Sequence, residues 1–279
     1  MTDRPGVPAL QTGAAPNMTR PLATPRKNPD AGDFYVCEFP KSGITFLTVL
    51  LANAMLIANG YRARATFSSV RNYIPDLCIG ESVASHSFAD PPLRFYKIHS
   101  EFSPQFIHAL YLVRHPVEVM ASNLRYAIGR GWWQPEVDGN FLDHPILGIE
   151  AWKRHIHSWL VDNSFASDVI FIHLLRYEDL VANAEAELRA IDRNFGWQLP
   201  EAAITGAVAA ASRDAMRSQE AYYGQHNPNH GFEFVSATGS DTDPQWRTRI
   251  EDSCQAELCL LYTSPSPRDQ RGSRMPSSA

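Results

Sequence analysis

The chain has 279 residues, of which 44% are hydrophobic and 20% are charged. These proportions are typical of a globular protein, and they exclude a chain that is disordered throughout, a collagen-like fibre and a coiled coil. The net charge of -5 argues against nucleic acid as a partner, because general binders of polyanions are basic. No apolar run approaches the roughly 18 residues of a membrane-spanning helix, so we expect no membrane partner either.

The first 30 residues are rich in Pro, Thr, Ala and Gly and show no apolar periodicity, so we expect a flexible leader. This leader lacks the basic–apolar–small pattern of a signal peptide. The four cysteines form no CxxC pair. Both features predict reduced thiols and a cytoplasmic location.

Residues 31–258 alternate between short, almost continuously apolar runs and helical patterns. Apolar runs of this kind are typical of strands buried on both faces, as in a parallel sheet. In chain order the pattern predicts strand Phe34–Phe39, helix Thr45–Asn59, strands Phe95–His99 and Leu110–Val113, helices Pro116–Gly129 and Ile149–Val161, strand Val169–Leu174, and helices Leu180–Phe195 and Ala202–Arg217. The alternation predicts an α/β domain of three layers, with a central parallel β-sheet flanked by helices.

The loop after the first expected strand reads PKSGIT, from Pro40 to Thr45, and leads into a helix. Such a loop offers backbone N–H groups and hydroxyls to an anion, and the helix dipole and Lys41 add positive potential. An ordinary strand–helix turn with a surface lysine is the alternative. The loop is not a Walker A motif, because that motif has glycines before its lysine.

Basic side chains also follow the next two expected strands. His99 ends the second strand and Arg114 follows the third. Ligands of parallel sheets bind beyond the carboxyl ends of the strands, so we expect Lys41, His99 and Arg114 to line one crevice. A nucleotide triphosphatase would need a carboxylate there to hold magnesium. The pattern instead predicts a phosphorylated ligand that is bound without a metal.

Five segments resemble, in the same order along the chain, motifs of the cytosolic-type sulfotransferases, which use 3′-phosphoadenosine 5′-phosphosulfate. DFYVCEFPKSGITFL resembles their Y-P-K-S-G-T-T-W loop, and FYKIH resembles the K-T-H that carries their catalytic histidine. LYLVRHPVEVMASN resembles their 3′-phosphate segment, and RYEDL and ASRDAM resemble two segments beside the adenine. These matches extend from Asp33 to about Ile250.

The resemblance implies a P-loop-NTPase-like sulfotransferase fold over residues 31–258. It implies transfer of a sulfuryl group to a hydroxyl or amine of a small-molecule or glycan acceptor, without a metal. Lys41 would stabilise the departing phosphate oxygen, and His99 would take the proton of the acceptor. The implied donor-binding residues are Lys41, Ser42, Gly43, Ile44, Thr45, Phe46, Arg114, Ser122, Tyr177, Ser212, Arg213 and Gly239.

The chain departs from the family pattern at several of these positions. Ile44, Phe46 and Arg213 stand where the family usually has Thr, Trp and Phe. The family also has a basic R-K-G before G-x-W, whereas this chain reads FVSATG over residues 234–239. Arg247 or Arg249 would have to replace the basic pair. Losing one charged hydrogen bond would cost about 1.5–3 kcal/mol of donor affinity.

Two alternatives stay open. A P-loop-type kinase or phosphotransferase shares the fold and the loop logic, and the missing basic pair and Ile44 leave room for a non-catalytic nucleotide-binding relative. For the acceptor side, Trp132 and Trp133 on a glycine-flanked loop are candidate pocket residues, together with Tyr222. The alternative for the tryptophans is one buried ring and one ring on the surface. The ten histidines have no convincing ligand spacing, so we expect no metal site.

The last segment, residues 259–279, combines Ser, Pro and Arg in a way that favours disorder. Its CLLYTSPSPRD and GSRMPSSA stretches resemble translated sequencing-adapter sequence. We therefore expect this segment to be foreign to the protein and the domain to be cut short near Leu258.

Overall fold

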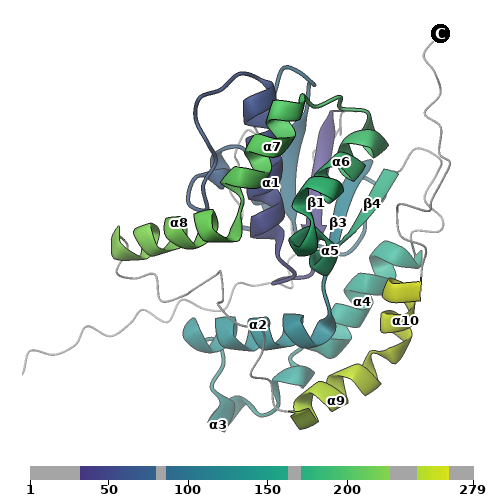
Figure 1. Ribbon diagram of the computed structural model, residues 1–279. Helices are drawn as coiled ribbons and strands as arrows, with labels where there is room; N and C mark the ends of the chain where they lie inside the picture. Colours follow the sequence, from purple (N-terminus) through teal and green to yellow (C-terminus); the bar gives the residue numbers. More distant parts are fainter. Residues whose placement is uncertain (1–31, 80–85, 163–170, 227–243, 264–279) are drawn as a thin grey trace, which may run out of the picture.

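A computed structural model of the chain describes residues 32–79, 86–162, 171–226 and 244–263 (Figure 1). Its centre is a sheet of four strands, β1 (Asp33–Glu38), β2 (Arg94–Ile98), β3 (His108–Val113) and β4 (Phe171–Arg176). The strands are all parallel and lie in the order β2-β1-β3-β4. The predicted parallel sheet is thus confirmed, although Val169 and Ile170 of the fourth expected strand lie outside the described residues.

The sheet is central because both of its faces are apolar. Every residue of β1 is buried, and alternate side chains enter two different cores. Phe34 and Val36 pack into the core that contains α1 (Ile44–Ala58). Tyr35 and Cys37 pack into the core that contains α4 (Ile149–Leu160). A strand with this pattern requires a layer of helices on each side.

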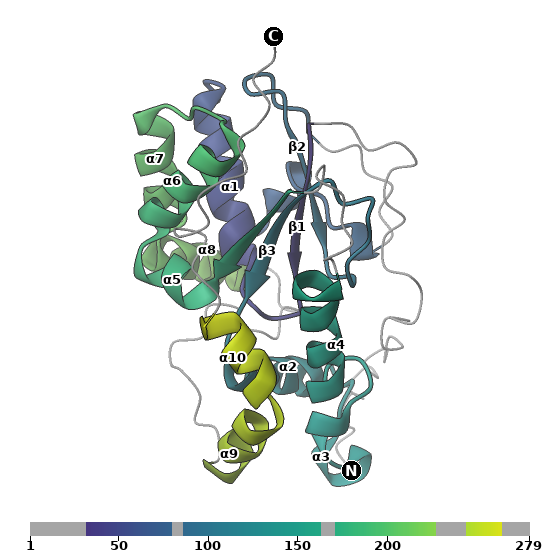
Figure 2. The ribbon, with the colours of Figure 1, turned by 90° about the vertical axis from the view of Figure 1, so that its right-hand side faces the viewer.

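The helices supply these two layers (Figure 2). One layer holds α1, α6 (Ala184–Phe195) and α7 (Glu201–Ala210), and α1 packs along α7. On the other side, α4 packs into the second core. The helices α2 (Pro116–Gly129), α9 (Pro244–Ser253) and α10 (Gln255–Thr263) contribute to the same core and lie beyond the carboxyl ends of the strands. Within the described ranges, the remaining helices are α3 (Pro135–Asp138), α5 (Tyr177–Ala182), α8 (Arg213–His226) and 3₁₀ turns at Val70–Asn72, Leu77–Ile79 and Phe141–Asp143. This three-layer arrangement confirms the expected fold class.

Two expected helices are each divided into two, so their predicted extents are wrong. The pattern over Leu180–Phe195 splits into α5 and α6 at Asn183, whose side chain accepts a hydrogen bond from the N–H of Ala186 at 3.0 Å. The pattern over Ala202–Arg217 splits into α7 and α8, and Ser212 caps α8 through the N–H of Ala215 at 3.3 Å. In both cases a capping side chain starts a new helix inside an unbroken apolar pattern.

The C-terminal helices α9 and α10 were not expected from the sequence. The predicted domain boundary at Leu258 falls inside α10, which continues to Thr263. Leu261 is buried in the same core as α4, and its carbonyl accepts a hydrogen bond from Arg176 at the end of β4. The packed part of the chain therefore extends beyond that boundary, whereas residues 264–279 and 1–31 lie outside the described residues.

Candidate functional site

The loop between β1 and α1 turns sharply over its lysine and glycine. Lys41 has a φ of 75° and Gly43 a φ of 114°, both in the left-handed region. A side chain costs energy in that region, so the conformation of Lys41 marks a strained backbone of the kind found at functional sites. Ser42 holds the turn through its hydroxyl, which donates to the carbonyl of Phe39 at 2.8 Å.

The loop packs against residues that follow the two neighbouring strands β3 and β4. The ring of Tyr177 lies so close to Gly43 that any β-carbon there would collide with it. The guanidinium of Arg114 lies over the same ring, 4.5 Å from its centroid, and its Nη1 donates to the carbonyl of Lys41 at 3.4 Å. The predicted crevice residues of β1 and β3 therefore meet, with Tyr177 packed beneath both.

The end of β1 contributes a residue that the motif analysis missed. Glu38 is 2% exposed, and its carboxylate accepts hydrogen bonds from the N–H of Lys41 at 3.2 Å and of Ile44 at 2.7 Å. Burial raises the pKa of Glu38 to about 7, although Lys97 and Lys41 oppose that shift. A single carboxylate in the apolar run FYVCEF was the available signal.

The ammonium group of Lys41 lies over an aromatic ring of α2. Its Nζ is 4.6 Å from the centroid of Tyr126. Burial lowers the pKa of Lys41 to about 8, which leaves the side chain largely protonated at neutral pH. No sequence signal distinguishes Tyr126 from any other helical tyrosine, and only the packing of α2 against the loop reveals it. Asn123 makes part of that packing by donating to the carbonyl of Pro40 at 3.0 Å.

His99 lies at the carboxyl end of β2, beside Glu38. Its Nδ1 is 3.3 Å from the main-chain carbonyl of Glu38 and 3.9 Å from Oε1 of the same residue. Nδ1 therefore carries the proton that this carbonyl accepts, and the lone pair is on Nε2. Burial, reinforced by Lys97, lowers the pKa of His99 to about 4, so the imidazole is neutral at pH 7. Lys97 itself pairs with Asp76 at 2.9 Å, and neither was expected in the site.

Arg114 connects the loop to α9 through ion pairs. Glu118 lies 3.6 Å from Nη2 of Arg114 and 3.3 Å from Nη2 of Arg247. The Nε of Arg114 is buried and has no hydrogen-bond partner among the described residues. A buried donor without a partner is costly unless it meets an acceptor, so this atom fits an anion. Ser122 is half-buried four residues beyond Glu118 on α2, on the same side of the helix.

The two adjacent tryptophans are both half-buried and contact one small apolar cluster. Trp132 packs edge-on against Tyr126 with centroids 5.3 Å apart, and Trp133 packs edge-on against Phe141 at 5.4 Å. The alternative of one buried and one surface ring is therefore wrong. We call Tyr126, Trp132 and Trp133 the aromatic cluster. Because Tyr126 also lies under Lys41, this cluster begins beside the lysine that the sequence predicts to be catalytic.

The remaining expected site residues do not lie with the residues gathered at the strand ends. Phe46 is half-buried against the core of α1, and Tyr222 is 66% exposed on α8. Ser212 and Arg213 are exposed at the start of α8. Gly239 lies outside the described residues. The geometry thus joins Lys41, Ser42, Gly43, Ile44, His99, Arg114 and Tyr177, and it leaves the α8 residues untested.

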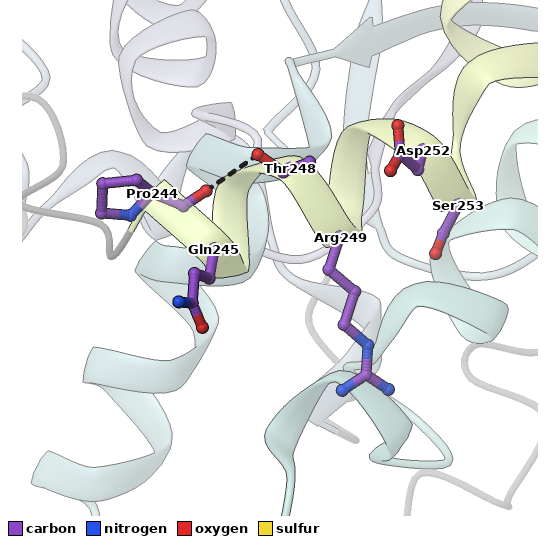
Figure 3. A pocket seen from close by; sticks show the side chains of 6 residues that line it. All are labelled: Pro244, Gln245, Thr248, Arg249, Asp252 and Ser253. Atoms are coloured by element: carbon purple, nitrogen blue, oxygen red, sulfur yellow. Dashed lines mark hydrogen bonds between the residues drawn. The ribbon is translucent and has the colours of Figure 1, made fainter.

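A hollow of about 530 Å³ lies elsewhere, along α9 (Figure 3). Its lining residues are Pro244, Gln245, Thr248, Arg249, Asp252 and Ser253, all from one helix. It is open, and the one residue it shares with the sequence predictions is Arg249, a candidate substitute for the basic pair. The chemistry of the strand ends is therefore the better guide to the site. Across the described ranges, no group of three or more His, Cys, Asp or Glu side chains could hold a metal ion, and no helix is long and apolar enough to cross a membrane.

Comparison with known proteins gives consistent matches. The model of the sulfotransferase domain family matches residues 31–249. Rat sulfotransferase 1A1 is 23% identical over 202 residues, which make up 66% of this chain and 67% of that protein. Among solved structures, retinol dehydratase in complex with retinol and PAP has a TM-score of 0.54 at 14% identity, covering 89% of this chain and 84% of its own. Mouse sulfotransferase SULT7A1 in complex with PAP has a TM-score of 0.52 at 15% identity, covering 85% and 90%.

Proposed function

The chain belongs to the sulfotransferase family, and from that premise we propose that it moves a sulfuryl group from 3′-phosphoadenosine 5′-phosphosulfate to an acceptor hydroxyl or amine. The observation that carries the proposal is the convergence of Lys41, His99 and Arg114 at the carboxyl ends of three adjacent parallel strands. Family membership favours sulfuryl transfer over the phosphotransferase alternative.

The loop and Arg114 supply complementary charge for the two phosphates of the donor. N–H groups of residues 42–45, at the start of α1, would hold the 5′-phosphate, because the N-terminus of a helix attracts anions. The N–H of Ser42 donates to the carbonyl of Phe39 at 3.2 Å and that of Ile44 donates to Glu38, so the phosphate would have to replace these two acceptors. Arg114 and Ser122 would hold the 3′-phosphate. The buried, unpartnered Nε of Arg114 supports this assignment, and the retinol dehydratase and SULT7A1 structures, which contain PAP, are consistent with it.

Transfer needs one proton acceptor and one stabilised leaving oxygen. The acceptor oxygen or nitrogen attacks sulfur while Nε2 of His99 takes its proton, which a neutral imidazole can do. The bond between sulfur and the 5′-phosphate oxygen breaks in line with the attack, and the ammonium of Lys41 stabilises the charge on that oxygen. The sulfuryl group ends on the acceptor and the electron pair on the phosphate.

Two further assignments complete the proposed site. The aromatic cluster of Trp132, Trp133 and Tyr126 would contact an apolar acceptor, which agrees with the retinol and androsterone in the retinol dehydratase structures. Arg247 is the better substitute for the missing basic pair, because it reaches Glu118 beside Arg114. Arg249 instead pairs with Asp143 at 3.4 Å.

The direct test is transfer of labelled sulfate from the donor to a panel of phenols, alkanols, amines and sugars in the presence of EDTA. We expect labelled product with the full chain and a loss of roughly 10²–10³-fold in kcat for Lys41→Met, which removes the charge at the leaving oxygen. Donor binding with no turnover on any acceptor would favour the non-catalytic alternative. Phosphoryl transfer from ATP that requires magnesium would favour the kinase.

A further inference from the structure

A buried carboxylate occupies the loop to which we assign the donor's 5′-phosphate. Glu38 binds the N–H of Ile44 through Oε2 and the N–H of Lys41 through Oε1, at 2.7 and 3.2 Å. Gly43, the N-cap of α1, has no side chain that could cap the helix. Glu38 is therefore the anion at the start of α1, supplied by the chain itself.

An ionised Glu38 and a phosphate exclude each other at this point. Ile44 has a single N–H to donate, and it already points at the carboxylate. Two anions placed side by side in a buried site also repel each other. Such repulsion favours the protonated form of the weaker acid, which here is the carboxyl group of Glu38. Protonated Glu38 answers both conflicts: it is neutral, and its O–H can donate to a phosphate oxygen in place of the N–H of Ile44.

Resting on the donor assignment proposed above, we infer that Glu38 takes up a proton when the donor binds, so that donor affinity falls as the pH rises. The proton comes from solvent and adds to one carboxylate oxygen of Glu38, and no other covalent bond changes. Glu38 would then set the pH range in which this sulfotransferase accepts its donor.

The groups that face Glu38 define the necessary control. They are Lys41 in the loop, Cys37 on β1, Lys97 and His99 on β2, and Tyr111 on β3. Burial raises the pKa of Cys37 and of Tyr111 and lowers that of His99 to about 4, so these three keep their charge between pH 7 and 8. Burial lowers the pKa of Lys41 to about 8, so this lysine is a competing source of pH dependence. Lys97 forms an ion pair with Asp76 at 2.9 Å.

The test is calorimetric titration of the full chain with adenosine 3′,5′-bisphosphate at pH 7 and pH 8, in buffers of different ionisation enthalpy. We expect about fivefold weaker binding at pH 8, with uptake of about one proton there, because burial raises the pKa of Glu38 to about 7. Glu38→Gln keeps the shape and an acceptor oxygen, and we expect it to lose both the pH dependence of the affinity and the proton uptake. Lys41→Arg keeps its charge at either pH, and we expect it to retain the pH dependence and the proton uptake.

Each result has a distinct consequence. Unchanged pH dependence in Glu38→Gln, or its loss in Lys41→Arg, would overturn the role of Glu38 while leaving donor binding intact. Zero proton uptake by the wild-type protein would do the same, and that measurement does not depend on whether either variant folds. Absence of bisphosphate binding by every protein at both pH values would overturn the donor assignment and this inference together.

Discussion

The strand ends and the surrounding helical region of this protein place their side chains in different ways. At the strand ends, His99 and Arg114 directly follow β2 and β3, and parallel pairing fixes them next to the loop of β1. In the helical region, Trp132, Trp133 and Arg247 are positioned by loops and by packing between α2 and α9. Sequence order therefore determines neighbours at the strand ends, whereas tertiary packing determines them around the aromatic cluster.

The difference predicts that changes at the strand ends affect chemistry and donor binding, whereas changes in the aromatic cluster affect the acceptor. The largest effect should come from His99. Replacing it with Gln removes the proton acceptor, and we expect kcat to fall about 10²–10⁴-fold. Bisphosphate binding, measured by calorimetry, should stay within about twofold of wild type. A loss in kcat below about tenfold would mean that another group takes the proton.

The acid limb of the rate profile provides a second test of the same residue. Because burial lowers the pKa of His99 to about 4, its base form persists well below the usual range of histidine. We expect kcat, measured at saturating donor, to hold its value from pH 7 to about pH 5 and to fall towards pH 4. Circular dichroism at each pH would show whether the protein stays folded. A midpoint near 6.5 would contradict the buried environment.

Arg114→Ala tests which of the two phosphates of the donor Arg114 binds. We expect affinity for adenosine 3′,5′-bisphosphate to fall by about 1.5–3 kcal/mol, and affinity for adenosine 5′-monophosphate to change little. Arg249→Ala is the matched control, because Arg249 is exposed on α9 and pairs with Asp143. Equal losses for both nucleotides would show that Arg114 acts through Tyr177 and the loop instead of the 3′-phosphate.

Gly43→Ala tests the close approach of the loop to Tyr177. The new β-carbon would collide with the ring and also adopt a φ of 114°, so we expect donor affinity to fall by about tenfold or more. Gly60→Ala isolates the backbone cost, because Gly60 has a φ of 72° with nothing within 4 Å of the new carbon. That control should lose about 1–2 kcal/mol of stability and no donor affinity. Equal effects in the two variants would contradict a role for the contact with Tyr177.

The smallest effect should come from the aromatic cluster. Trp133→Ala removes an edge-on contact with Phe141, and we expect a roughly threefold higher KM for an aromatic acceptor and an unchanged affinity for the bisphosphate. Tyr222→Ala, at a ring that is 66% exposed, should change neither quantity. If Tyr222→Ala raised the acceptor KM instead, the acceptor would lie beside α8.

The sequence allows more to be predicted at the strand ends than in the helical region. The apolar strands, and the basic groups that follow them, could be predicted because a parallel sheet aligns its carboxyl ends. The roles of Glu38 and Tyr126 could not. A lone carboxylate in an apolar run marks Glu38, but its bonds to the N–H groups of the loop depend on the fold of that loop, and the contact of Tyr126 depends on how α2 meets it. The breaks at Asn183 and Ser212 were missed because a capping side chain interrupts a helix without interrupting its apolar period.

The most direct test of the central claim, a donor site at the strand ends, is the melting temperature of the full chain with adenosine 3′,5′-bisphosphate in EDTA, beside ATP with magnesium. Ligand at about 100 times its Kd adds about 2.7 kcal/mol to the free energy of unfolding, which a melting curve resolves. We predict stabilisation by the bisphosphate in EDTA. Stabilisation by ATP with magnesium alone would contradict the account.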